Sequence, residues 1–112
     1  MTVRAVIDPG VLVSALLSKG SPPDAIVQRW KRDRFELIVS PQLVAEFVEV
    51  VSRAKFSSRI LSEDIAEIVT LLQHNATLQG DPPNAERLTD DPDDDYLAAL
   101  AVEAQADFLV SG

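Results

Sequence analysis

The chain has 112 residues and a net charge of −8, and its length suits one domain with a single hydrophobic core. With no cysteine and one histidine, it cannot form disulfides, thiolate nucleophiles or zinc sites built from these residues. Because no apolar stretch reaches about 18 residues and no basic leader precedes the first apolar segment, we expect a cytoplasmic protein without a membrane span.

Most of the excess negative charge lies in one segment. Residues 81–95 hold seven acidic residues against one arginine, which accounts for six of the eight excess charges. A negative sum therefore does not exclude a nucleic-acid ligand, because the rest of the chain is nearly balanced. Basic residues gather at 29–34 and 53–59, and they either contact phosphates or complement helix C-termini. The candidates for RNA contact in these two groups are Arg29, Arg32, Arg53 and Lys55.

Strand and helix patterns alternate along the chain. The segment VRAVID is typical of a short buried strand that ends at Asp8, because Pro9 pushes its predecessor out of the helical region. Ser40 followed by Pro41 predicts a helix start, and Ser62 is the expected N-cap of a later helix. The patterns predict helices over 11–20, 24–34, 41–56, 61–76 and 91–105, and strands over 3–8, 35–40, 76–79 and 106–112.

This alternation favours one α/β domain over residues 1–112, with a mainly parallel sheet that helices cover on both faces. Neither a linker nor a second domain is needed. The large aromatic side chains are expected in its core, namely Trp30, Phe35, Phe47, Phe56 and Phe108.

Two acidic residues are candidates for a site in such a fold. Ligands collect beyond the carboxyl ends of parallel strands, which is where Asp8 follows the first strand. At about 100° per residue from Leu43, the apolar arc of this helix runs from Val50 near 340° through 0° to Val48 near 140°. Glu46 falls near 300°, next to the Val50 border of this arc. Glu49, near 240°, faces water by the same arithmetic.

The stretch TDDPDDDYLAALA places five aspartates before an apolar run. Asp91 and Pro92 are typical of an N-cap and a first helical residue, and Asp93 is favoured by the helix dipole. With Asp94 at 0°, the apolar residues that follow fall between about 240° and 340°, so Asp94 borders the core face. Asp95 points about 100° further outward.

Asp8, Glu46 and Asp94 come from separate elements and offer only oxygen ligands, which indicates a site for Mg²⁺ or Mn²⁺. A calcium loop starting at Asp91 is excluded, because Tyr96 and Val102 stand where such a loop needs a glycine and a bidentate glutamate. The alternative is that all three acids are helix caps and surface charges.

Taken in order, the strand ending in Asp8, then VLVSALL, SPQLVAEFVEVVSR and DPDDDYLAALAVEAQADFLVSG, resemble the PIN-domain ribonucleases, in particular VapC-like toxins of toxin-antitoxin pairs. The likeness covers nearly the whole chain. It implies a three-layer α/β/α domain that cuts single-stranded RNA, forms a homodimer and binds a cognate antitoxin protein. It also implies that Asp8 and Asp94 bind Mg²⁺ or Mn²⁺, and that Glu46 holds a second metal or orients the attacking water.

Two departures from the family pattern stand out. The family usually follows its first aspartate with a small polar residue and asparagine, where this chain has Pro9 and Gly10. The pattern ADFLVSG normally continues with another acidic residue, a helix and a strand. The resemblance therefore predicts that the C-terminal end of the domain is missing after Gly112, is supplied by a partner chain, or is lost in a weakened nuclease.

Two other functions stay open. A non-catalytic PIN-like module that binds an antitoxin or an RNA-processing partner is favoured by Gly10 and by the missing end. A phosphatase or receiver-like Mg²⁺ domain shares the strand-terminal Asp8, but Gly10 stands where it needs a second aspartate, and lysines are scarce.

Overall fold

The computed structural model describes residues 2–53, 59–82 and 92–111, with residues 92–95 described by their backbone alone. Strands and helices alternate as the sequence predicts, with ends that differ by a few residues. In chain order the elements are β1 (Arg4–Ile7), α1 (Pro9–Leu17), α2 (Pro22–Lys31), β2 (Glu36–Val39), α3 (Pro41–Val51), α5 (Ser62–His74), β3 (Thr77–Leu78), α6 (Pro92–Glu103) and β4 (Phe108–Val110).

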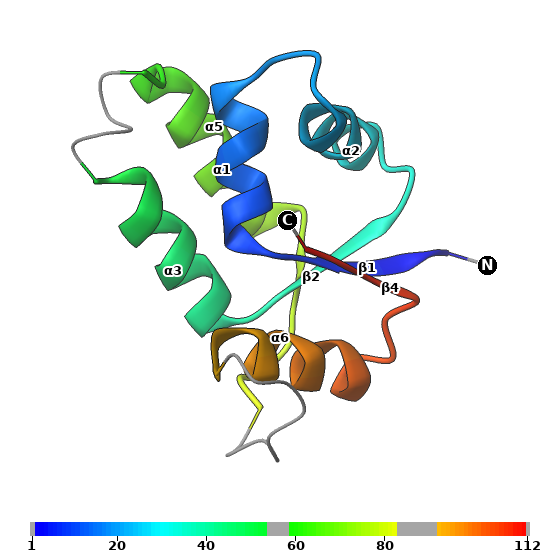
Figure 1. The fold of residues 1–112 in the computed structure, drawn as a ribbon. Coiled ribbons are helices and arrows are strands. Elements are labelled where there is room, and N and C mark those ends of the chain that lie inside the picture. The colour runs from blue at the N-terminus through cyan, green and yellow to red at the C-terminus, as the bar shows by residue number, and fades with distance from the viewer. Residues whose placement is uncertain (1, 54–58, 83–91, 112) are drawn as a thin grey trace.

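The four strands form a parallel sheet in the order β3-β2-β1-β4. The connections from β1 to β2 and from β2 to β3 step in one direction, whereas the connection from β3 to β4 returns. Because such crossovers are right-handed, α1, α2, α3 and α5 cover one face of the sheet and α6 covers the other (Figure 1). The predicted three-layer α/β/α architecture is confirmed.

The core lies between the sheet and its helices. Central strands buried on both faces read as continuous apolar runs, and Leu37 to Val39 in β2 are at most 1% exposed. Trp30 and Phe47 are buried as predicted. The prediction for Phe108 is wrong, because β4 is an edge strand and leaves this side chain 61% exposed. Phe56 lies outside the described residues.

Two predicted helix caps have different outcomes. Ser40 is the N-cap of α3 and is fully buried, and its Oγ accepts a hydrogen bond from the Leu43 amide at 3.2 Å. The prediction for Ser62 is wrong: Leu61 occupies the N-cap position of α5, and no side chain there makes a capping hydrogen bond. Glu63 and Asp64 in the first turn complement the helix dipole instead. No helix in the described ranges is long and apolar enough to cross a membrane.

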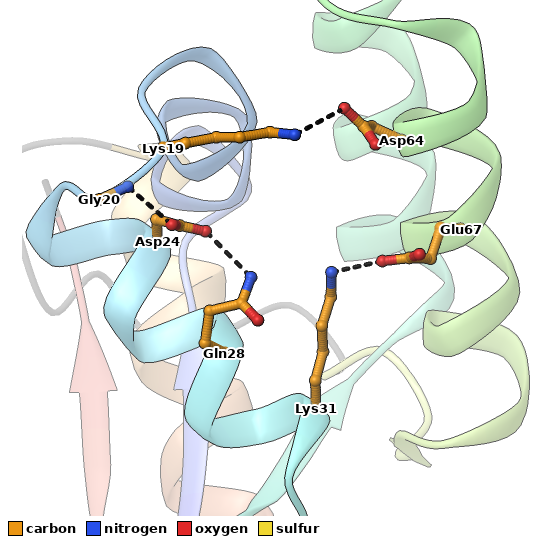
Figure 2. Close-up of polar contacts among 7 residues, drawn as sticks. All are labelled: Lys19, Gly20, Asp24, Gln28, Lys31, Asp64 and Glu67. Carbon is orange, nitrogen blue, oxygen red and sulfur yellow. Dashed lines mark hydrogen bonds and ion pairs between the residues drawn. The ribbon is translucent and has the colours of Figure 1, made fainter.

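Asp24 ties α2 to the turn that precedes this helix. Asp24 Oδ2 accepts a hydrogen bond from the Gly20 amide at 2.8 Å, and its Oδ1 accepts one from Gln28 Nε2 at 3.2 Å (Figure 2). The Gly20 hydrogen bond, followed by that from Gln28, holds the pKa of Asp24 below its ordinary value of 3.8.

We expect Asp24→Ala to lower the free energy of unfolding by about 1 kcal/mol at neutral pH, as the loss of a capping side chain does. A lowered folded-state pKa means that the ionic part of this stabilisation is complete above the unfolded value of 3.8 and is lost as the pH falls through the lower folded value. Urea denaturation of both proteins at neutral and at acidic pH measures it. An equal loss of unfolding free energy in Asp24→Ala at both pH values would contradict a lowered pKa of Asp24 in the folded state.

Candidate active site

The carboxyl edge of the sheet has a topological switch point between β1 and β4. The chain leaves β1 for α1 on one face and reaches β4 from α6 on the opposite face (Figure 1). Ligands of open parallel sheets bind in the crevice outside such a point. The residue that follows β1 here is Asp8.

Asp8 is held at the junction of the sheet and α1. Its backbone amide donates to the Val110 carbonyl of β4 at 2.9 Å, which continues the sheet pairing by one residue. Its Oδ1 accepts a hydrogen bond from the Gly10 amide at 2.7 Å and caps α1. Within the described part of the chain, Oδ2 accepts no hydrogen bond, so one carboxylate oxygen is left for a ligand.

Gly10 allows a close approach to this carboxylate. A Cβ atom at this position would lie 3.3 Å from Asp8 Oδ1, which is tighter than most contacts of a real Cβ. The departure from the family pattern at Gly10 therefore leaves the backbone N–H as the only hydrogen-bond donor of this residue, which donates to Asp8.

Glu46 lies half-buried in the second turn of α3, whereas Glu49 is exposed, as their helical phases predict. The helical phases wrongly grouped Val48 with the side chains that face the core. Val48 is 42% exposed, because the neighbouring elements do not cover this end of the apolar arc. Both oxygens of Glu46 accept hydrogen bonds: Oε2 from the Tyr96 hydroxyl at 2.7 Å, and Oε1 from Gln42 Nε2 at 3.4 Å.

The hydrogen bond from Tyr96 links the first half of α6 to α3. Tyr96 is only 8% exposed, and its ring belongs to the core cluster. The backbone of Asp94 lies two residues earlier on the same helix, or about 3 Å along the helix axis. The main chain of Asp94 is thus within one helical turn of the residue that contacts Glu46, while its side chain lies outside the described groups.

Gln42, Asp81 and Tyr96 also lie at this edge, although the sequence alone did not assign them to it. Asp81 Oδ1 accepts a hydrogen bond from the Gln42 backbone amide at 2.9 Å, which places another carboxylate at the N-terminus of α3. The signal for Tyr96 was its place near the border of the apolar stripe of α6, since a buried tyrosine hydroxyl normally has a hydrogen-bond partner. Asp81 follows a two-residue strand, and no sequence pattern pairs it with Gln42.

The electrostatics of this edge suit a cluster of acids. Helices α1, α3 and α6 all begin there, and their N-terminal dipole ends stabilise negative charge (Figure 1). The available donors are carboxylate oxygens, which are the ligands that Mg²⁺ and Mn²⁺ prefer. Among the described residues no three acidic or histidine side chains form a ready metal site, and these residues do not include the side chain of Asp94.

The predicted RNA contacts lie in two separate places. Arg29 and Arg32 are at the C-terminal end of α2, near the amino edge of the sheet and away from Asp8. Arg53 forms an exposed ion pair with Glu49 at 3.6 Å and lies just after the end of α3, the helix that carries Glu46. Lys55 lies outside the described residues, and RNA contact by all four basic residues stays a prediction.

A comparison with protein families agrees with this arrangement of elements. A family model described as PIN domain matches residues 4–112, a range that contains Asp8, Glu46 and Asp94. No curated protein matches the chain.

Proposed function

We propose that this chain, which belongs to the PIN-domain family, is a metal-dependent endoribonuclease that hydrolyses phosphodiester bonds of single-stranded RNA. PIN domains are in general nucleases. The observation that carries the proposal is the hydrogen bond between Tyr96 and Glu46, because it joins the second turn of α3 to the start of α6 beside Asp94. Asp8 lies at the same edge, at the end of β1.

In this mechanism Asp8, Glu46 and Asp94 would hold Mg²⁺ or Mn²⁺, and Glu46 would also orient the attacking water. Asp8 has one oxygen held by the Gly10 amide, and its other oxygen accepts no hydrogen bond from the described residues. Glu46 has both oxygens held from neighbouring side chains, which limits its rotation and suits a group that receives or directs a proton. A bound divalent cation would lower the pKa of its water and neutralise phosphate charge.

Cleavage of a mixed RNA pool tests this function. We expect the native chain to cleave RNA with Mg²⁺ or Mn²⁺, and Asp94→Asn to abolish most of the cleavage. Asp95→Asn is the matched control, because it removes the same charge from the next residue. The proposal is wrong if the native chain does not cleave RNA with either ion, or if both variants cleave equally.

A second prediction concerns the hydroxyl that holds Glu46. We expect Tyr96→Phe to keep the fold, since the ring stays buried, and to lower kcat roughly ten- to a hundred-fold, as the loss of a group that orients an active-site residue does. Steady-state kinetics over a pH series measures it, with KM expected to change little. Unaltered kcat and pH dependence in this variant would show that the hydroxyl has only a structural role.

The sequence resemblance further supports the toxin role of a toxin-antitoxin pair, with a cognate antitoxin as partner, a homodimer and a cytoplasmic location. Growth arrest on expression, relieved by Asp94→Asn, is the expected result for a toxin. Light scattering of the purified chain tests the dimer. Growth without arrest would argue against the toxin role. A monomeric mass would argue against the homodimer.

A non-catalytic binding module is the second candidate, and Gly10 is the observation that favours it. This residue offers Asp8 only a backbone N–H group and no side-chain contact to a ligand. A module of this kind would show no stabilisation by Mn²⁺ that depends on Asp8 or Asp94.

A further inference from the structure

The end of α2 carries three arginines that line one hollow. The hollow has a volume of about 390 Å³ and its walls are formed by Arg29, Arg32 and Arg34. It lies just before β2 begins at Glu36, near the amino edge of the sheet. The hollow is therefore separate from the candidate site at Asp8, which lies at the carboxyl edge.

A Schellman motif at the helix end brings the three residues together. With Arg32 as C-cap, the Asp33 amide donates to the Trp30 carbonyl at 2.9 Å, and the Arg34 amide donates to the Arg29 carbonyl at 3.0 Å. Asp33 adopts the positive φ of 57° that this motif requires. The second hydrogen bond folds the chain back, so that Arg34 lies beside Arg29.

The pairing of Arg29 with Arg34 differs from the usual form of this motif. A hydrophobic contact commonly joins the two positions that these residues occupy, whereas here both side chains carry a positive charge. The helix dipole accounts for cations in the last turn, but Arg34 lies beyond the helix. Backbone amides already donate to the carbonyls of Gln28, Arg29 and Trp30, so the guanidinium groups are not needed at these three carbonyls.

None of the three arginines has a carboxylate partner among the described residues, although Asp33 is their neighbour in sequence. Most other described cations are paired: Arg4 with Glu36, Lys19 with Asp64, Lys31 with Glu67 and Arg53 with Glu49. Lys31 shows the contrast best, because it lies between the arginines in sequence and yet reaches across to α5 (Figure 2).

We infer that the hollow formed by Arg29, Arg32 and Arg34 is a second binding site for the phosphate groups of single-stranded RNA, remote from the site of cleavage. Guanidinium groups bind phosphate oxygens in pairs of parallel hydrogen bonds, and three of them around one hollow suit consecutive phosphates of one strand. The choice of RNA as the ligand rests on the proposed nuclease function.

The distance between the two sites gives this inference a requirement on RNA length. Strand β2 alone separates the edges by roughly 10 Å, so an RNA of the length that single-strand sites cover, about 4–16 nucleotides, is long enough to reach both sites. An RNA of this length would be held at the arginines while another part of it enters the crevice.

Binding of a fluorescent RNA of about sixteen nucleotides in EDTA tests the inference. Without a divalent cation the acidic crevice repels phosphate, so anisotropy reports the hollow and no cleavage occurs. For the variant with Arg29, Arg32 and Arg34 all changed to Gln, we expect roughly ten-fold weaker binding at low salt. We also expect the slope of log K against log salt to become shallower by about 2, or about 0.7 for each of three phosphate contacts.

The matched control changes Lys19 and Gln73 to Glu. It shifts the net charge by the same three units, from −8 to −11, at exposed positions that neither line the hollow nor belong to the basic groups at 29–34 and 53–59. We expect its affinity for RNA to stay within about two-fold of the native chain, because the arginines of the hollow are unchanged in it. Equal losses in both variants would show that only net charge matters and would overturn the inference.

If the arginine variant keeps its affinity for RNA and its salt dependence, the inference that the hollow binds RNA is also overturned. An acidic segment of a protein would then be the next ligand to test at the hollow. Cleavage with Mg²⁺, measured on the same RNA, separates this inference from the proposed function. RNA binding that depends on the arginines without any cleavage supports the hollow and contradicts the nuclease. Cleavage with undiminished binding in the arginine variant supports the nuclease and contradicts the hollow.

Discussion

Glu46→Gln is expected to lower the rate of RNA cleavage roughly a hundred- to a thousand-fold, which corresponds to about 3–4 kcal/mol of transition-state stabilisation. Glutamine has nearly the shape of glutamate and can exchange hydrogen bonds with Tyr96 and Gln42, so the fold should persist. What it lacks is the negative charge that orients water or supports a cation. Single-turnover cleavage with saturating Mg²⁺ measures the chemical step without product release.

Glu49→Gln is the matched control for this experiment. It removes the same charge from the same helix, three residues further on, where the side chain is exposed and pairs with Arg53. Its rate should stay within about two-fold of the native rate, because an exposed ion pair contributes little. If both variants lose activity to the same extent, the effect reflects general electrostatics and Glu46 has no specific role.

Phe47→Ala is expected to lower the free energy of unfolding by about 3–5 kcal/mol, the range for removing a buried aromatic side chain. Phe47 is fully buried and is among the largest such side chains in the structure. Since small domains are typically stable by about 5–15 kcal/mol, this single change removes a large share of the stability. Urea denaturation followed by circular dichroism measures it.

The neighbouring Val48 provides the control for Phe47. Val48 is 42% exposed, so Val48→Ala should change the free energy of unfolding by no more than about 0.5 kcal/mol. A loss below about 1 kcal/mol in Phe47→Ala would contradict the packing of α3 against the sheet. That packing matters for function, because it positions Glu46 beside the start of α6.

The fold could be predicted from the sequence because its signals are local. The β-branched run before Asp8 and the pair Ser40 and Pro41 each specify an element end from a few neighbouring residues, and the structure confirms both. The exposure of Phe108 could not be predicted in this way. It depends on β4 being at the edge of the sheet, which is a property of strand order and not of the strand itself.

The candidate site could be predicted only in part, because only some of its signals are local. Helical phase placed Glu46 at the border of the core, and the structure agrees. The contacts that hold Glu46 come from Tyr96, fifty residues away in the chain, and from Gln42. The contact with Tyr96 joins distant segments, which leave no periodic pattern in one sequence, so this partner was not found. Gln42 lies one helical turn before Glu46, and this spacing of four residues was the signal that could have found it. The convergence of Asp8, Glu46 and Asp94 on one cation stays a prediction.

Calorimetric titration with Mn²⁺ tests that convergence most directly. The native chain is compared with Asp8→Asn, Glu46→Gln and Asp94→Asn, and asparagine at position 8 still caps α1 because it is as good an N-cap as aspartate. If the three carboxylates share one cation, each change should weaken the same Mn²⁺ site at least about ten-fold. Mn²⁺ affinity that is unchanged in any one of the three variants would contradict a shared site.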